Sequence, residues 1–180
     1  MKTKKSKKRF KKKQQKGSNK PGRCRDLREG ATYHVSSRAN RGEKIFEDEK
    51  DKDDFMEVLE RARKKYNFHI VEMCIMTTHI HFIIKPAPGS SLSRIMQFIL
   101  SVSARIWNKR RETTGHVWRA RFFSRVIEGL EDLKNVTLYI QNNPIEAGIL
   151  HSIEELEDWK YCGAWCVKHN RTKIFEVPQS

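Results

Sequence analysis

The sequence predicts an α+β fold of the ferredoxin-like βαββαβ type, an antiparallel sheet with two helices on one face. Four short stretches rich in β-branched and aromatic residues alternate with two longer stretches that carry apolar residues at helical spacing. Their order along the chain is strand, helix, strand, strand, helix, strand, and a further helical stretch follows the last strand. With 180 residues the chain is long enough for one such domain with its own core.

The first half of the pattern begins with a strand at 31–39, "ATYHVSSRA", which alternates in character and is rich in β-forming residues. A helix is expected over 51–66, because its apolar side chains fall on one face. The stretches "FHIVEMCIM" and "HIHFIIK" then predict two strands, joined near Thr77 and Thr78. The first half of the chain therefore supplies a strand, a helix and a two-stranded hairpin.

The second half begins with a helix over about 91–111, which Ser90 or Ser91 can cap. The basic loop "RETTGHVWRAR" leads to a fourth strand, "FFSRVIE". A last helix, "LEDLKNVTLYIQN", is expected to end or kink near Asn143, because Pro144 disfavours helical backbone in the residue before it. Beyond Gly148 we expect an accessory region in which aromatic residues act as packing anchors: Trp159, Tyr161 and Trp165.

The charge of the chain is unevenly distributed. The formal net charge is +15, and residues 1–25 hold 13 of the 37 basic side chains and none of the 22 acidic ones. We therefore divide the chain into a disordered Lys/Arg-rich arm at 1–28, a domain at 29–150 and a C-terminal extension at 151–180. A polybasic arm attracts nucleic-acid backbones by counterion release, and the alternative is a solvated tail that only aids solubility.

Other features bear on the compartment. No apolar stretch is long enough to span a membrane, and none follows the N-terminal charges as in a secretory signal. The four cysteines do not suggest a disulfide framework, so we expect a reduced cytoplasmic protein. Cys162, Cys166 and His169 allow the hypothesis of a zinc-stabilised interaction domain, although their spacing fits no strong zinc template.

Two histidines interrupt an otherwise apolar predicted strand, "MCIMTTHIHFIIKP". Residues i and i+2 of a strand point to the same face, so His79 and His81 present two imidazoles side by side. That spacing suits one shared metal ion, and zinc or, with oxygen donors, magnesium or manganese would fit. The alternative is that both histidines are structural, with their ring nitrogens bonded inside the fold.

Two further segments carry candidate residues. Tyr139 and Asn143 in "LYIQNNPIEAG" are four residues apart and can share a helix face. The simpler interpretation is that Tyr139 packs and Asn143 caps a following turn. In "GHVWRARFFSRV", basic side chains could clamp phosphates and an indole could stack on a base, or the loop is an ordinary basic surface with the indole in the core. The residues concerned are Arg119, Arg121, Arg125 and Trp118.

Four pieces of the chain, in order, resemble the HUH single-tyrosine transposases, specifically the REP-associated branch. They are "YHVSSRANRGEKIFED", "MTTHIHFII", "SLSRIMQFILSVSARIWNKRRETTGHVWRARFFSRVIE" and "LYIQNNPIEAG", and the resemblance covers about residues 31–165. The chain departs from the family at Thr77–Thr78, where Pro-Asn is usual, and at Gln141, where an acidic or aliphatic residue is usual. Neither departure falls on a proposed ligand or on the nucleophile.

The resemblance implies residue roles that the residues alone leave open. It implies that Tyr139 is the nucleophile and that His79, His81 and Asn143 hold a divalent cation, Mg²⁺ or Mn²⁺. The implied substrate is single-stranded DNA, often at imperfect palindromic hairpins, cleaved and rejoined through a 5′-phosphotyrosine link. DNA contacts are expected from the residues of the basic loop and first strand: Arg38, Arg119, Arg121, Arg125 and Trp118.

We therefore expect a metal-dependent tyrosine transposase in the cytoplasm, associated with the nucleoid. The extension after residue 150 favours a monomer over a dimer that exchanges its tyrosine helices. The alternative from another functional class is a non-catalytic, domesticated nucleic-acid-binding protein on the same fold.

Overall fold

The structure is a computed structural model and describes residues 27–171. Most of the predicted basic arm, and residues 172–180 of the predicted extension, lie outside the described residues. The strands are β1 (Tyr33–Arg38), β2 (Phe68–Ile75), β3 (His79–Pro86) and β4 (Phe123–Val126). The helices are α1 (Glu49–Lys65), α2 (Leu92–Arg110), α3 (Gly129–Glu146) and α4 (Gly163–Lys168), with 3-10 turns at Asn40–Gly42 and Glu154–Asp158.

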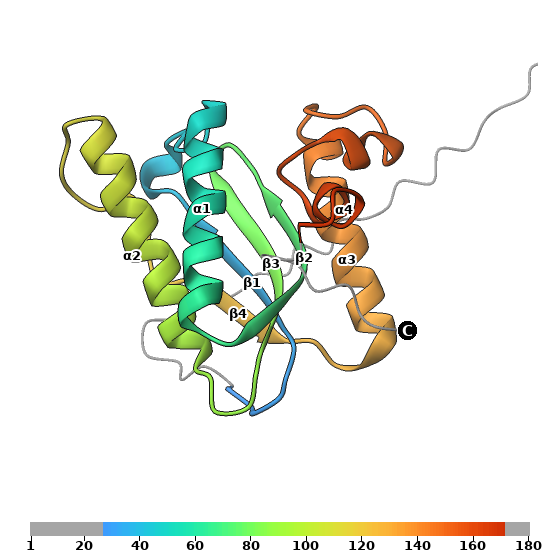
Figure 1. Ribbon diagram of the computed structural model, residues 1–180. Coiled ribbons are helices and arrows are strands. Elements are labelled where there is room, and N and C mark those ends of the chain that lie inside the picture. Colours follow the sequence, from blue (N-terminus) through green and yellow to red (C-terminus); the bar gives the residue numbers. More distant parts are fainter. Residues whose placement is uncertain (1–26, 172–180) are drawn as a thin grey trace, which may run out of the picture.

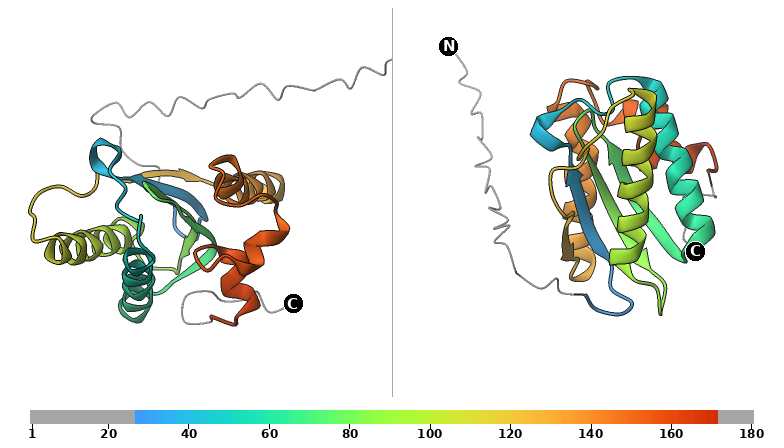
Figure 2. Two further views of the ribbon diagram at one scale, coloured as in Figure 1. Left: turned by 90° about the horizontal axis from the view of Figure 1, so that it is seen from above. Right: turned by 90° about the vertical axis from the view of Figure 1, so that its left-hand side faces the viewer.

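The four strands form one antiparallel sheet in the order β2-β3-β1-β4. This is the βαββαβ arrangement that the sequence predicts, so the expected fold class is confirmed. Figure 1 shows α1 and α2 on one face of the sheet and α3 on the other, and the view from above in Figure 2 shows the same layers. The added helix α3 thus covers the face that the ferredoxin-like unit leaves open.

The main core lies between the sheet and the α1–α2 layer. Phe55 of α1 packs against Phe82 of β3 with ring centroids 6.4 Å apart, and both are fully buried. Helix α2 begins where predicted, with the Ser91 hydroxyl accepting the amide N–H of Arg94 at 3.4 Å. At its other end, Arg110 and Arg111 donate to the buried carboxylate of Asp51, which ties α2 to the start of α1.

The opposite face of the sheet has a smaller apolar cluster, beneath α3. Val136 and Ile140 of α3 are buried against Cys74 of β2 and Ile83 of β3. Apolar side chains four residues apart give α3 a stripe that fits this face. The remaining turns of α3 are free to carry polar side chains beyond the apolar contact.

Helix α3 runs to Glu146, with Pro144 inside it, so the predicted end near Asn143 is wrong. A proline lacks the amide N–H that would donate to the carbonyl four residues earlier, so Pro144 removes one helical hydrogen bond, yet the helix continues past it. The carbonyl of Pro144 accepts the amide N–H groups of Ile149 and Leu150, and Gly148 takes the left-handed backbone (φ 69°) that often closes helices. Residues 139–143 therefore lie within the regular part of the helix.

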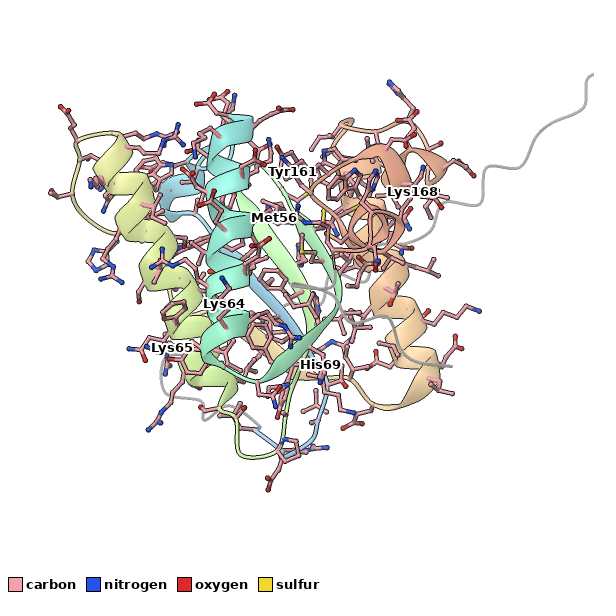
Figure 3. The ribbon with its side chains drawn as sticks, in the orientation of Figure 1. Met56, Lys64, Lys65, His69, Tyr161 and Lys168 are labelled. Atoms are coloured by element: carbon pink, nitrogen blue, oxygen red, sulfur yellow. The ribbon has the colours of Figure 1, made fainter. Side chains whose placement is uncertain are left out.

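The segment after α3 covers the edge strand β2. The carbonyl of Tyr161 accepts the amide N–H of Ile75 at 3.0 Å, and the backbone of Cys162 forms an isolated antiparallel β-bridge with that of Cys74, while both thiols remain free. The Tyr161 hydroxyl also donates to Asp53 of α1, and Figure 3 shows this ring between α1 and the C-terminal segment. The expected anchor role of Tyr161 is confirmed, since it is 4% exposed. Within residues 27–171, no helix combines the length and apolar character needed to cross a bilayer.

Candidate active site

The two motif histidines lie on the sheet face that α3 covers. The cross-strand partners are Arg38 for His79 and Ser36 for His81, and partners in register share a face of the sheet. Ile80 and Phe82 point the other way, into the core beneath α1 and α2. The strand alternation inferred from the sequence therefore holds, and the imidazole centroids are 5.1 Å apart with nearly perpendicular planes.

His79 contacts two polar side chains. Its Nδ1 lies 3.0 Å from the hydroxyl oxygen of Thr78, and the side chain of Asn143 is close enough to raise the pKa of His79, against the larger lowering by burial. The Nδ2 group of Asn143 donates to the carbonyl of Tyr139 at 2.7 Å, so its amide oxygen is not used in that bond. The alternative that Asn143 caps a following turn is thus wrong. Asn143 and the two imidazoles therefore lie near one another, and their role as ligands stays a prediction.

A third histidine, His34 of β1, belongs to the same cluster and was not singled out from the sequence. It is buried, with Nε2 3.3 Å from Nδ1 of His81. Alternation along β1 puts His34 on the face of Ser36 and Arg38, and this signal was present in the sequence. The missing information was the pairing of β1 with β3, which brings residues 47 positions apart into contact.

Tyr139 stands over the histidine cluster. Its ring meets that of His81 edge-on at 5.4 Å and that of His34 at 5.8 Å. About half of the side chain is exposed to solvent, so a substrate can reach it. Tyr139 on α3 and the two motif histidines on β3 come from distant parts of the sequence. The fold brings them together within one chain.

Burial keeps the histidines of the cluster neutral. Desolvation is the main reason that the pKa values of His34 and His79 fall to about 4, and the positive charges of Arg125 and Arg38, respectively, add to it. The pKa of His81 is also lowered, by burial and then by its histidine neighbours. A neutral imidazole has a lone pair on one nitrogen, which is the form that binds cations.

Glu72 of β2 holds α3 in place over this cluster. Its buried carboxylate accepts N–H groups from three places: Met73 at 2.9 Å, Gly163 of α4 at 3.1 Å and the side chain of Gln141 of α3 at 2.8 Å. A β-bulge between Ile70 and Glu72 turns Glu72 away from the main core toward α3. Gln141, where the family usually has an acidic or aliphatic residue, is thus the partner of a buried carboxylate.

The predicted DNA-contacting residues fall into two groups. Arg38, Arg119 and Arg121 are exposed, and the amide N–H of Arg119 donates to the carbonyl of Arg38, which places these two residues side by side. For Trp118 the base-stacking interpretation is wrong and the core alternative is confirmed, because its indole is buried against Phe46 and donates to the carbonyl of Leu100.

Arg125 also differs from the expectation. Its guanidinium makes a bidentate pair with Asp132 at 2.7 and 2.8 Å, which joins β4 to the first turn of α3. Because both terminal nitrogens bond Asp132, we infer that Arg125 supports the fold, and its contact with DNA stays a prediction.

The cysteine-based zinc hypothesis is wrong for the part of the chain that the structure describes. Cys162 donates to main-chain carbonyls, and His169 stacks on Trp165 with ring centroids 4.2 Å apart. Between residues 27 and 171, no three His, Cys, Asp or Glu side chains form a group suited to a metal ion. Any cation at the histidine cluster would therefore need a donor of another kind, such as the Asn143 amide.

A ferredoxin-like sheet with paired histidines on one strand, facing a tyrosine on an added helix, is the arrangement of the single-tyrosine transposase class that the motifs resemble. The family model described as "Transposase IS200 like" matches residues 28–143. The chain belongs to this IS200-like transposase family.

Two relatives show how far the similarity extends. A curated Haemophilus influenzae protein, provisionally named a REP-associated tyrosine transposase, is 26% identical over 118 residues, which cover 60% of this chain and 65% of that protein. A solved structure of a REP-associated tyrosine transposase bound to a REP hairpin superimposes with a TM-score of 0.67. That comparison covers 88% of this chain and 90% of the other at 16% identity, so it concerns the fold alone.

Proposed function

We propose that this chain is a transposase of the REP-associated type, which cleaves and rejoins single-stranded DNA with Tyr139 as nucleophile. The observation that carries the proposal is the position of Tyr139, edge-on to His81 and His34 and half exposed. A tyrosine that only packed would be expected in the apolar stripe of α3, with Val136 and Ile140. Membership of the IS200-like family and the name of the curated relative support the same activity.

The proposed step is an in-line displacement at phosphorus. The Tyr139 oxygen forms a bond to the phosphorus atom, and the bond from phosphorus to the 3′-oxygen breaks. The phenol loses a proton and the 3′-oxygen gains one, so the products are a 5′-phosphotyrosine and a free 3′-hydroxyl. A 3′-hydroxyl can reverse the step and join strands without an external energy source, because the covalent link keeps the phosphodiester energy.

The donor set fits a divalent cation. His79 and His81 lie side by side with Asn143 near His79, and the three side chains are neutral and offer nitrogen and oxygen donors. A mixed nitrogen and oxygen set suits Mg²⁺ less than Mn²⁺, and the choice between them is open to measurement. When bound, the cation would neutralise charge on the scissile phosphate and orient it. Arg38, which is next to His79 in register, would add positive charge at the same place.

We further propose that the protein acts as a monomer on hairpin DNA. One chain carries the complete set of Tyr139, the histidines and Asn143, so no second copy is needed to complete the site. The segment from 151, which we assign to a C-terminal extension of the 29–150 domain, holds α3 through Gly163 and Glu72. The exposed side chains of Arg119 and Arg121 offer a basic surface for the DNA backbone.

The test uses single-stranded oligonucleotides with imperfect palindromes from the DNA that flanks the gene. With Mg²⁺ or Mn²⁺, the wild-type protein should form a denaturation-resistant adduct that retains a label at the 3′ end of the strand but not one at the 5′ end. Tyr139→Phe should bind the same DNA without forming the adduct. Tyr66→Phe is the control, because Tyr66 packs against Phe98 at the main core, on the opposite side of the sheet.

Two outcomes contradict the proposal. An adduct that persists in Tyr139→Phe would show that another residue is the nucleophile. DNA binding without an adduct, across metals and repeat sequences, would favour a non-catalytic binding protein instead.

A further inference from the structure

His34 is the member of the histidine cluster to which neither the motif nor the proposed chemistry gives a role. It sits on β1, diagonal to His81 in the sheet, since its own cross-strand partner is Ile83. Its side chain is 8% exposed, and it lies between His81, Tyr139 and Phe123. Such a polar group costs free energy in buried surroundings unless its nitrogens are used.

The contact between His34 and His81 has the geometry of a hydrogen bond. The nitrogens Nε2 of His34 and Nδ1 of His81 are 3.3 Å apart, whereas the ring centroids are 5.5 Å apart with planes inclined by 22°. The centroid distance exceeds the nitrogen distance by about two ring radii, so the rings meet nitrogen to nitrogen instead of face to face. One of the two nitrogens must carry the proton, because two lone pairs in contact repel each other.

The direction of this bond decides whether His81 can hold a cation. If Nδ1–H of His81 donates to His34, then Nε2 of His81 has a free lone pair. If His34 donates instead, the proton of neutral His81 must be on Nε2, and that nitrogen cannot bind a cation. The bond therefore fixes the chemical form of the neighbouring ring as well as its orientation.

We propose that His34 is a positioning residue: its Nε2 accepts the Nδ1–H of His81 and keeps Nε2 of His81 unprotonated and directed at the shared cation. This inference rests on the proposed function, because it assumes that His81 is a ligand. The contact of Thr78 with Nδ1 of His79 is the counterpart on the other imidazole. Partners of this kind typically change metal affinity 10- to 100-fold when they are removed.

The first experiment reads the tautomers directly. Long-range ¹H–¹⁵N correlation spectra of the ¹⁵N-labelled protein, without metal or DNA, distinguish Nδ1–H from Nε2–H in each histidine. We expect His81 to be protonated on Nδ1 and His34 to have an unprotonated Nε2. A His81 ring protonated on Nε2 would overturn the inference, whatever the cleavage assay shows.

The second experiment measures Mn²⁺ affinity by electron paramagnetic resonance. His34→Phe should bind Mn²⁺ about 10- to 100-fold more weakly, and His34→Gln, whose carbonyl can replace Nε2 as acceptor, should recover most of the loss. His69→Gln, at the far end of β2 (Figure 3), is the matched control and should not change the affinity. Wild-type affinity in a folded His34→Phe would overturn the inference.

Cleavage adds a readout that a purely structural role would not move. Because the expected defect is in metal affinity, adduct formation by His34→Phe should be restored by raising the Mn²⁺ concentration, and a defect that excess Mn²⁺ does not restore would count against the inference. The two ideas can fail separately. If the wild-type protein shows the predicted tautomers and binds DNA but never forms an adduct, the proposed function is refuted and the role of His34 is still supported.

Discussion

Replacing Glu72 by alanine should release α3 from the sheet, because one buried carboxylate joins β2, α3 and α4. The substitution leaves the backbone N–H groups of Met73 and Gly163 without their acceptor in buried surroundings, at roughly 1–3 kcal/mol each. The side chain of Gln141 is partly exposed and can turn to water. Burial raises the pKa of Glu72, so removing the carboxylate also relieves a desolvation cost that offsets part of the loss.

The net expectation is a loss of about 3 kcal/mol in the free energy of unfolding, or a melting temperature lower by roughly 6–12 °C for a chain of this size. Urea unfolding followed by circular dichroism measures the first, and calorimetry measures the second. Gln141→Ala is the graded control, with an expected loss of about 1 kcal/mol. A Glu72→Ala protein within about 0.5 kcal/mol of wild type would refute the idea that this carboxylate holds the helix.

Three further predictions concern charge. His34 has an ordinary pKa near 6.5 when unfolded and about 4 when folded, so the unfolded chain binds its proton first and stability is lost as the pH falls through this window. Without metal, His34 alone should account for about 3 kcal/mol of this loss in the free energy of unfolding. The free energy of unfolding of His34→Phe should therefore depend less on pH between 4 and 6.5. An unchanged dependence on pH would contradict the assigned pKa. Arg121→Gln should lower the salt dependence of DNA binding by about one counterion. Arg125→Gln should instead lower the free energy of unfolding by about 1 kcal/mol. If DNA titrations and urea unfolding showed that Arg121→Gln affects stability and Arg125→Gln affects DNA binding, both assignments would be contradicted.

The order of elements could be predicted from the sequence because it depends on local patterns. Apolar residues at helical spacing and alternating strands are properties of neighbouring residues, and they predicted the sheet and its helices. The same alternation predicted that His79 and His81 share a face. Pro144 misled the assignment of the end of α3, because the residue before a proline is biased away from helical backbone but is not excluded from it.

The composition of the site could not be predicted in full, because it depends on strand pairing and on irregular backbone. His34 joins the cluster only through the pairing of β1 with β3. Glu72 faces α3 only because a bulge reverses the alternation of β2. Trp118 was placed among the DNA contacts by its basic neighbours, although its large apolar ring is more stable in the core.

The most direct test of the account is to locate the covalent bond. A single-stranded hairpin oligonucleotide is incubated with the wild-type protein and Mn²⁺, the adduct is digested with trypsin and nuclease, and the modified peptide is sequenced by mass spectrometry. We expect a nucleotide 5′-phosphate on Tyr139 and a released fragment that ends in a 3′-hydroxyl. A nucleotide on any other side chain, or a released fragment that ends in a 3′-phosphate, would contradict it.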